Sequence, residues 1–454
     1  MDQLSAVTRP PSEPAFDARR FPPAARRNRL VQTLRLNNDP LAELLRARDR
    51  HGSVFTLRIL PYRAGIVCAT DPETNQQVLT DDSRFAAGDA ADLIEPLVGS
   101  GSLILTPSPR HGRNRKLLMP PFHGQRIARW SDVIGELVEE QLPDLLTGSP
   151  VAVRPWAQRL TLEVILRVVF GVEDKQRRDV YREALDRLMS PRVLAVLFAP
   201  EPLRRDLGRF SPGGQLWRRR RAVDALLLEE IATRRADPRA DQKEDVLSVL
   251  LSARDEDGVG FTDEELRDEL KGLVLAGHET TATALAWTLH LLAHHPAARD
   301  RLAADLTEGS RGYLAACIKE AMRLRAPVFD AVRIATTDTE LGGRPVPAGA
   351  YVSAMFCTTH LAEDVWPDAQ SFQPDRHLDG SRSTWSLTPF GGGARRCLGA
   401  ALAQLELEVV LAKVLERAVP QPAGELERTR LLGVTLVPAR GGRVTFHARQ
   451  DVLA

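Results

Sequence analysis

The most informative stretch of the sequence is Phe390-Gly391-Gly392-Gly393-Ala394-Arg395-Arg396-Cys397-Leu398-Gly399. Apolar residues at helical spacing follow it directly, over residues 398–418. This spacing predicts that Cys397 lies at or just before the N-terminus of a helix. There the positive end of the helix dipole and two neighbouring arginines would stabilise a thiolate. The glycines leave the backbone free to approach a large group closely and to offer N–H groups to the sulfur.

The spacing of this stretch resembles the cytochrome P450 signature, F-x-x-G-x-R-x-C-x-G. The matching positions, with two that continue the pattern, are Phe390, Gly393, Arg395, Cys397, Gly399, Ala403 and Glu406. The resemblance implies that Cys397 is the axial thiolate ligand of a haem iron. It also implies that Phe390, Gly391, Arg395 and Gly399 surround the cofactor. The alternative for a lone cysteine is a buried thiol after a glycine-rich turn.

Composition excludes several classes of protein. The 454 residues include 61 Lys and Arg against 60 Asp and Glu, so the charge balance indicates no nucleic-acid partner. The four cysteines are widely separated and form no C-x-x-C pair, which argues against a zinc knuckle and a disulfide framework. Reduced, cytoplasmic surroundings fit this cysteine usage.

The N-terminal 30 residues are rich in Pro, Ala and Arg, and we expect a flexible leader there. They contain no apolar h-region, so neither a signal peptide nor a membrane anchor is expected. The longest apolar run, residues 273–293, includes His278 and Glu279, which would be costly in lipid. We therefore expect this run to form a buried helix. The chain length is compatible with about three ordinary domains or with one large helical domain, and the resemblance favours one domain over residues 31–454.

The first third of that domain predicts a small sheet and a long loop. Residues 53–59 and 65–70 read as two strands around a turn at 61–64. Residues 86–108 contain turn residues and a fragment of helix but no sustained period, and such long loops are often functional. The resemblance makes this the loop over the substrate pocket, with Leu93, Val98 and Leu103 as contacts. An ordinary surface excursion is the alternative.

Two further segments acquire a role through the resemblance. His111 and Arg115 are four apart and share one helix face, and in the family the corresponding helix binds a haem propionate. Many members have Trp at the first of these positions, which weakens the assignment of His111. Residues 190–214 contain several prolines around the apolar patch 193–198, and we interpret them as a helix–loop–helix lid. A plain connector is the alternative.

A long helix is predicted from Thr262 to a stop at Pro296, because Thr262 and Glu265 form a capping box. Its centre resembles the family motif A-G-x-[DE]-T. The resemblance places Ala276 and Gly277 beside the cofactor, Leu273 and Ala276 against the substrate, and Thr280 and Glu279 as the catalytic pair. In that pair Thr280 hydrogen-bonds the bound oxygen and Glu279 helps to deliver protons through water. The alternative is a polar helix segment with purely structural hydrogen bonds.

A zinc hydrolase motif is excluded in the same segment. His278 and Glu279 begin H-E-x-x-H, but Ala282 occupies the position of the second histidine.

The remaining motifs lie between this helix and the cysteine. Glu320 and Arg323 are three apart on a predicted helix over 312–325, and Arg376 follows in a Phe-x-Pro-x-Arg run. The resemblance makes these three a buried structural network. It assigns Arg333 to a haem propionate and Val328, Phe329 and Leu436 to the substrate. Asp330 is less expected there, and we predict that it faces the pocket or supports Arg333. Residues 339–355 and 432–446 read as hairpins, the second around Gly441 and Gly442.

Together with the predicted helices and strands, the resemblance implies a mainly α protein with small β-sheets and the cytochrome P450-like fold, in which the long central helix and the cysteine loop sandwich a haem. The resemblance implies a soluble, bacterial-type monomer with non-covalent haem b. It implies insertion of one oxygen atom from O₂ into a lipophilic small molecule, such as a fatty acid, terpene, steroid or polyketide. A ferredoxin and its reductase would supply electrons, with Arg113, Lys116 and Arg396 as candidate docking cations. A peroxide-using or isomerising relative and a non-catalytic haem-thiolate binder remain open.

Overall fold

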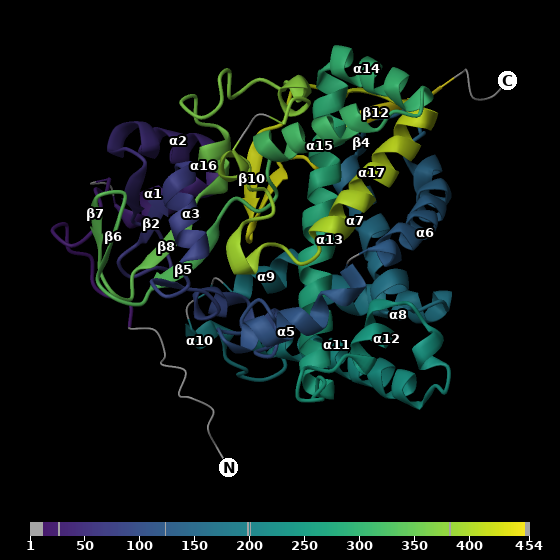
Figure 1. The fold of residues 1–454 in the computed structure, drawn as a ribbon, viewed down its shortest axis with the longest axis horizontal. Helices are drawn as coiled ribbons and strands as arrows, with labels where there is room; N and C mark the ends of the chain where they lie inside the picture. The colour runs from purple at the N-terminus through teal and green to yellow at the C-terminus, as the bar shows by residue number, and fades with distance from the viewer. Residues whose placement is uncertain are drawn as a thin grey trace. The chain divides into compact units, whose positions relative to one another are not determined.

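The computed structural model describes residues 12–25, 28–122, 124–197, 199, 201–380 and 383–449. Within them the chain forms two compact units. Unit 1 comprises the chain up to Ala91, His294–Cys397 and Glu425–Arg440, and unit 2 comprises Asp92–Ala293, Leu398–Gly424 and the chain from Gly441. Helices predominate and the sheets are small, which confirms the predicted fold class (Figure 1).

Unit 1 holds the largest sheet. Its helices are α1 (Arg29–Asn38), α2 (Pro40–His51), α3 (Pro72–Thr80), α14 (Pro296–Thr307), α15 (Gly312–Leu324) and α16 (Phe356–His360). Its strands are β1 (Val54–Leu57), β2 (Ile66–Ala69), β3 (Phe85–Ala86), β5 (Ala331–Ala335), β6 (Thr339–Leu341), β7 (Arg344–Val346), β8 (Tyr351–Ala354), β10 (Thr429–Leu432) and β11 (Thr435–Pro438). Five strands form one sheet in the order β1-β2-β8-β5-β3, with β2 and β8 parallel and the other neighbours antiparallel.

This sheet is held by an apolar core that includes Val67, Phe85 and Val352, with α3 packed against β8. The predicted strands on either side of residues 61–64 are β1 and β2, which pair antiparallel. Of the predicted hairpin over 339–355, residues 339–346 form a hairpin as β6 and β7, whereas β8 pairs with β2 and β5.

The expected leader, residues 1–30, needs correction in its described part. Phe21 is 4% exposed and belongs to the core of unit 1, and Phe16 packs against the same cluster. The Ala64 N–H donates to Glu13 Oε1 at 2.8 Å. Buried aromatic side chains anchor this segment because they gain more from the core than the chain loses in entropy.

Unit 2 is largely helical. Its helices are α4 (Glu95–Val98), α5 (Arg110–Leu118), α6 (Gln125–Gln141), α7 (Val153–Val164), α8 (Lys175–Leu188), α9 (Pro191–Leu197), α10 (Glu201–Arg204), α11 (Pro212–Ala236), α12 (Val246–Ser252), α13 (Asp263–His294, apart from its last residue) and α17 (Ala400–Arg417). A π-helix, Ile165–Val169, continues α7. Strands β4 (Val151–Ala152), β9 (Ala418–Pro422) and β12 (Arg443–Ala448) form a sheet in the order β4-β12-β9.

The long helix α13 begins as predicted. The Thr262 N–H donates to Glu265 Oε2 at 2.9 Å, and the Glu265 N–H donates to Thr262 Oγ1 at 3.1 Å. This reciprocal pair satisfies two N–H groups that a helix start leaves unpaired. The helix ends at His294, before Pro296. The predicted helix–loop–helix over 190–214 is present as α9 and α10.

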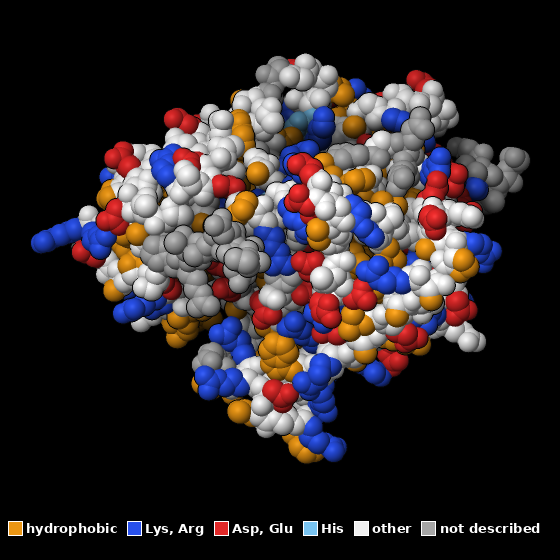
Figure 2. Space-filling model, turned by 60° about the horizontal axis from the view of Figure 1, so that its bottom comes forward, with side chains coloured by type: hydrophobic (Ala, Val, Ile, Leu, Met, Phe, Trp, Pro, Cys, Tyr) orange, Lys and Arg blue, Asp and Glu red, His pale blue; other side chains and the backbone are white. Residues whose placement is uncertain are grey.

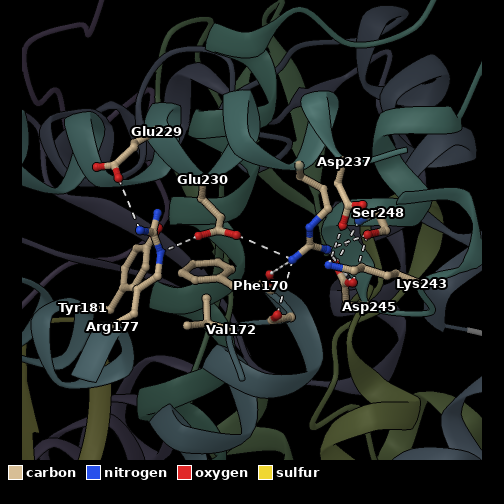
Figure 3. A network of polar contacts seen from close by, with 12 residues as sticks. Phe170, Val172, Arg177, Tyr181, Glu229, Glu230, Asp237, Lys243, Asp245 and Ser248 are labelled. Carbon is tan, nitrogen blue, oxygen red and sulfur yellow. Dashed lines mark hydrogen bonds and ion pairs between the residues drawn. The ribbon is translucent and has the colours of Figure 1, made fainter. Parts of the chain in front are cut away.

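A polar network joins α8, α11 and α12 in unit 2 (Figure 3). Arg177 on α8 points toward Glu230 on α11, with 2.8 Å between Nε and Oε2. Arg234, one turn further along α11, donates to Asp245 Oδ2 at 2.6 Å and to the Phe170 carbonyl at 3.1 Å. The network therefore connects α11 to the start of α12 and to the end of the π-helix.

The predicted hairpin over 432–446 is wrong. The turn lies at residues 433–434 instead, where β10 pairs with β11 in unit 1. After Gly441 and Gly442 the chain enters unit 2 as β12, which pairs with β9 and β4. Gly433 and the pair Gly441–Gly442 both favour a turn. Only the strands that pair on either side show which of the two positions closes a hairpin.

Candidate functional site

The loop that carries Cys397 is closed by its own backbone. The Cys397 N–H donates to the Phe390 carbonyl at 2.9 Å. Gly391 and Gly393 have φ of +68° and +66°, a conformation that side chains other than glycine rarely adopt. A Cβ at Gly393 would lie 2.1 Å from the carbonyl oxygen of Leu79 on α3. Glycine at 393 therefore permits close packing on α3. The sequence had instead predicted that the glycines allow close approach to a large group.

Cys397 differs from the other three cysteines in its exposure. It is exposed, whereas Cys68, Cys317 and Cys357 are buried. Burial raises the pKa of those three thiols and keeps them protonated. In sequence α17 begins three residues after Cys397, with Gly399 at its N-cap, as predicted. Of the four thiols, the one at 397 is accessible to a metal.

A buried carboxylate, Glu320 on α15, organises the predicted structural network of unit 1. Glu320 and Arg323 are both 0% exposed, and two hydrogen bonds of 2.8 Å join them. Arg376 Nε lies 3.1 Å from Glu320 Oε1, so the structure brings the three predicted residues together. His377 is a fourth member of the network that the motif did not predict, with its Nε2 2.7 Å from Glu320 Oε2. Its position directly after Arg376 in the motif was the available signal.

The donors around Glu320 decide its protonation. Burial by itself raises the pKa, but the hydrogen bonds from Arg323 and His377 outweigh it and lower the pKa of Glu320 to about 2. Arg323 also donates to the carbonyls of His360 and Ala369, at 2.6 and 2.8 Å. The network thus ties α15 to α16 and to the segment after it.

Arg333 on β5 is a buried cation whose hydrogen bonds are incomplete. It is 6% exposed, and Nη1 donates to the Val332 carbonyl at 2.9 Å. Its Nε is buried without a hydrogen-bond partner in the described part of the chain. Burial lowers the pKa of Arg333, while Asp82 opposes the shift. An anionic group is the natural partner for such a guanidinium.

The predicted substrate contacts of unit 1 differ in how far their side chains are buried. Val328 and Phe329 are partly exposed and remain candidates. Leu436 is 0% exposed, so its side chain packs in the interior, and its assignment needs correction. Its N–H donates to the Pro327 carbonyl at 2.8 Å, which places β11 beside the candidate stretch.

In unit 2, the residues at the centre of α13 differ in their exposure and in their contacts. Leu273, Ala276 and Thr280 follow one another at helical spacing and are exposed or partly exposed. The Thr280 hydroxyl donates to the Ala276 carbonyl at 2.5 Å. Gly277 faces Ile165 of the π-helix, and a Cβ there would lie 3.4 Å from Ile165 Cδ1, at ordinary contact distance. Packing on the π-helix therefore does not require glycine at 277.

Glu279 points toward α7. Arg154 donates to Glu279 Oε1 through Nε at 3.1 Å and through Nη2, and Gln158 donates to Oε2 at 2.8 Å. Thr283, one turn further along α13, donates to Oε1 at 3.4 Å. The predicted acid is therefore held by partners on another helix, which sequence reasoning missed because 125 residues separate Arg154 and Glu279.

His278 is buried beside Thr161 of α7. The Thr161 hydroxyl lies 3.1 Å from His278 Nδ1 and donates to the His278 carbonyl at 3.1 Å. Burial lowers the pKa of His278 to about 4, and Glu279 partly opposes the shift. The imidazole is therefore neutral at pH 7 and acts as a packed polar group.

The loop before α5 is fastened to the start of α13. The Gly101 N–H donates to Asp268 Oδ2 at 3.0 Å, and the Leu103 N–H donates to Glu269 Oε2 at 2.8 Å. Burial raises the pKa of Glu269 to about 8 despite these bonds. Leu103 is partly exposed, in keeping with a contact residue.

Of the other predicted loop contacts, Leu93 is partly exposed, but Val98 is 0% exposed and is corrected to a core residue.

The remaining predicted cofactor residues lie on short elements. His111 and Arg115 are both on α5, where His111 is buried and Arg115 partly buried. Arg395 ends a short 3₁₀ helix, Gly393–Arg395, within the cysteine loop.

Two of the candidate docking cations are neutralised. Arg113 Nε lies 2.6 Å from Asp255 Oδ2, and Lys116 Nζ lies 3.1 Å from Glu256 Oε1. Arg396 is exposed. On the face that Figure 2 shows, basic and acidic side chains are interspersed. Arg113 and Lys116 therefore offer a partner less positive charge than the sequence suggested.

Comparison with known proteins assigns the class. The family model described as Cytochrome P450 matches residues 22–425. The chain is 37% identical over 443 residues to a protein named cytochrome P450 135B1 from Mycobacterium tuberculosis, covering 96% of this chain and 93% of the relative. It is 35% identical to cytochrome P450 137 of the same species, over 89% of this chain and 85% of the relative.

Solved structures agree in fold. The haem domain of cytochrome P450DA has a TM-score of 0.84 at 22% identity, over 97% of this chain and 99% of that one. The retinoic acid-bound cyanobacterial CYP120A1 has a TM-score of 0.81 at 23% identity, over 94% and 99%.

Fold and family together define a haem-dependent monooxygenase with haem b as its cofactor. The chain belongs to the cytochrome P450 family. Within the described residues, the helices include none that is long and apolar enough to span a bilayer.

Proposed function

We propose that this enzyme inserts one oxygen atom from O₂ into a lipophilic small molecule, by hydroxylation or epoxidation, with Cys397 as the ligand of its haem iron. The observation that carries the assignment is the exposure of Cys397, in contrast to the three buried cysteines. A thiolate ligand is the donor this chemistry requires.

The residues of the chain fit the cofactor. Arg333 has a buried Nε without a partner in the described residues, which suits a propionate carboxylate. His111 and Arg115 are the other proposed propionate ligands. The proposed cofactor contacts are completed by Arg395, Phe390, Gly391, Gly399, Ala276 and Gly277.

Haem held by a thiolate supplies the activation of O₂ when it is bound. The chain contributes proton delivery and the exclusion of bulk water. Thr280 can exchange its bond to the Ala276 carbonyl for a bond to a ligand or a water. Glu279 is proposed to help deliver protons through water, and Arg154 and Gln158 hold it in position.

The proposals for the substrate and the redox partners rest on the resemblance to the family. Leu93, Leu103, Leu273, Ala276, Val328 and Phe329 are proposed to contact a fatty acid, terpene, steroid or polyketide-like substrate. A ferredoxin and its reductase are the proposed electron donors. The buried thiols Cys68, Cys317 and Cys357 fit a reducing cytoplasm, where we place the protein.

The ligand assignment is tested by Cys397→Ser. We expect the haem-loaded variant to lose the red-shifted Soret band of the reduced, CO-bound state, because serine offers no thiolate. Cys357→Ala is the matched control, since it removes a buried thiol and should keep the band. A normal band in Cys397→Ser would refute the assignment. Turnover driven faster by peroxide than by ferredoxin would favour a peroxide-using enzyme.

The proton-delivery role is tested by Thr280→Ala. We expect the variant to keep its pigment but to release several times more of the consumed reducing equivalents as hydrogen peroxide, measured against product with a substrate found by spectral screening. Thr288→Ala is the control, because Thr288 makes the same kind of bond, to the Ala284 carbonyl at 2.8 Å. Unchanged coupling in Thr280→Ala would remove Thr280 from the mechanism.

A further inference from the structure

A short stretch of unit 1 opens within an otherwise buried segment. Residues 328–332, between α15 and the middle of β5, are all partly exposed, whereas Pro327 before them and Arg333 after them are buried. Backbone hydrogen bonds fix the course of the stretch. The Pro327 carbonyl accepts from the Leu436 N–H at 2.8 Å, and the Phe329 carbonyl accepts from the Cys357 N–H at 3.2 Å. A polar side chain within it therefore has a defined position.

Asp330 is the charged residue of this stretch. Its Oδ2 accepts a hydrogen bond from Ser353 Oγ at 2.7 Å, and Ser353 is 0% exposed. Within the part of the chain that the structure describes, Ser353 is the residue that hydrogen-bonds this carboxylate. A carboxylate can accept about four hydrogen bonds, so most of its capacity is unused.

The chain neighbours of Asp330 in the partly exposed stretch are the apolar residues Val328, Phe329, Ala331 and Val332. Tyr62, Cys68 and Cys357 lie close enough to interact electrostatically with its carboxylate, and within the described residues it forms no ion pair with a cation. Burial raises the pKa of Asp330 to about 6, and the Ser353 hydrogen bond partly opposes the shift. A carboxylate in such a place is stabilised strongly by a cationic donor that arrives with a ligand.

We propose that Asp330 determines substrate specificity by binding a protonated amine, so that the substrate class is a lipophilic amine. The inference rests on the proposed function, because the partly exposed stretch also holds the proposed substrate contacts Val328 and Phe329. The apolar neighbours pack on the hydrocarbon body of the substrate, and the carboxylate forms a charge-assisted hydrogen bond with the ammonium group.

The experiment compares three probes with the same 12-carbon chain on the haem-loaded protein: N,N-dimethyldodecylamine, N,N-dimethyldodecanamide and dodecanoic acid. Binding is measured from the spin-state shift of the Soret band and, independently, by calorimetry. A tertiary amine is chosen because its substituents hinder ligation to iron. We expect the amine to bind about tenfold more tightly than the amide, and the acid to bind most weakly.

Asp330→Asn should abolish this preference while leaving the affinity for the amide within about twofold, because asparagine keeps the shape and an acceptor for Ser353. Asp338→Asn is the matched control, since Asp338 pairs with Arg20 at the surface of the same unit. Ser353→Ala should retain the preference, because it leaves the carboxylate in place.

Equal affinities for amine and amide, or an amine preference that survives in Asp330→Asn, would overturn the proposal and leave the ligand role of Cys397 intact. A protein without the thiolate signature in its CO-bound spectrum would refute the proposed function and this inference together.

Discussion

Glu320 and Asp330 are two carboxylates of the same unit, ten residues apart in sequence, and they behave in opposite ways. Glu320 is surrounded by Arg323, Arg376 and His377, and its pKa falls to about 2. Among the residues that the structure describes, Asp330 has one hydrogen bond, from Ser353, and its pKa rises to about 6. The comparison shows that burial alone does not set the charge of a carboxylate; the donors around it do. A saturated carboxylate is scaffold, whereas an unsaturated one can still bind a ligand.

The largest effect is expected from breaking the saturated site. Arg323→Ala should lower the free energy of unfolding by about 3–5 kcal/mol, because it leaves Glu320 buried with part of its charge uncompensated. Urea unfolding followed by circular dichroism measures this. Arg301→Ala, which removes the exposed ion pair with Asp375, is the control and should cost less than about 1 kcal/mol. A loss no larger than that in Arg323→Ala would show that the network is not structural.

The next effect concerns the unsaturated site and depends on pH. The pKa of Asp330 is higher in the folded state, about 6, than its ordinary value of 3.8. Its contribution to stability is therefore fully present below about pH 4 and is lost as the pH rises through 6. Asp330→Asn should thus gain stability relative to the parent between pH 4 and 7, by at most about 3 kcal/mol.

This gain is measured by urea unfolding across the pH range without an amine present. For Glu320, whose folded pKa is lowered, the sign is reversed, and its contribution should disappear as the pH falls from about 4.5 toward 2. A pH-independent difference between Asp330→Asn and the parent would contradict the assigned environment of Asp330.

The smallest expected effect on stability comes from His377, and it compares the contributions of the residues that bind Glu320. His377→Phe should cost about 1 kcal/mol, because it removes one hydrogen bond to Glu320 but keeps a ring beside Trp366, whose centroid lies 5.7 Å from that of His377. Thermal unfolding measures the loss. A cost as large as that of Arg323→Ala would mean that His377 is an equal partner in neutralising Glu320.

Local sequence patterns predicted much of the fold and part of the site. The capping box of α13, the helix after Cys397 and the grouping of Glu320 with Arg323 depend on residues close in sequence, where spacing determines geometry. Arg376 was assigned to the same network from the order of the motifs along the chain. The prediction of a flexible leader was wrong for this segment, because no local pattern shows that Phe21 belongs to the core beside the sheet.

The parts that sequence could not predict depend on distant partners. Some features can be predicted only when it is known which elements pack together. They are the contact between Arg154 and Glu279, the burial of Val98 and Leu436, and the turn at residues 433–434. Asp330 was recognised as unusual, but its bond to Ser353 was visible only in the sheet.

One consequence of α13 concerns laboratory evolution of the enzyme. Successive helix residues are separated by about 100° around the axis, so Glu279 and Thr280 meet different neighbours although they are adjacent in sequence. Libraries that vary Leu273 and Ala276 therefore sample one side of α13. Libraries that vary Thr283 and Gln158, which lies on α7 and also contacts Glu279, sample another. Combining winners from the two sets should give nearly additive gains.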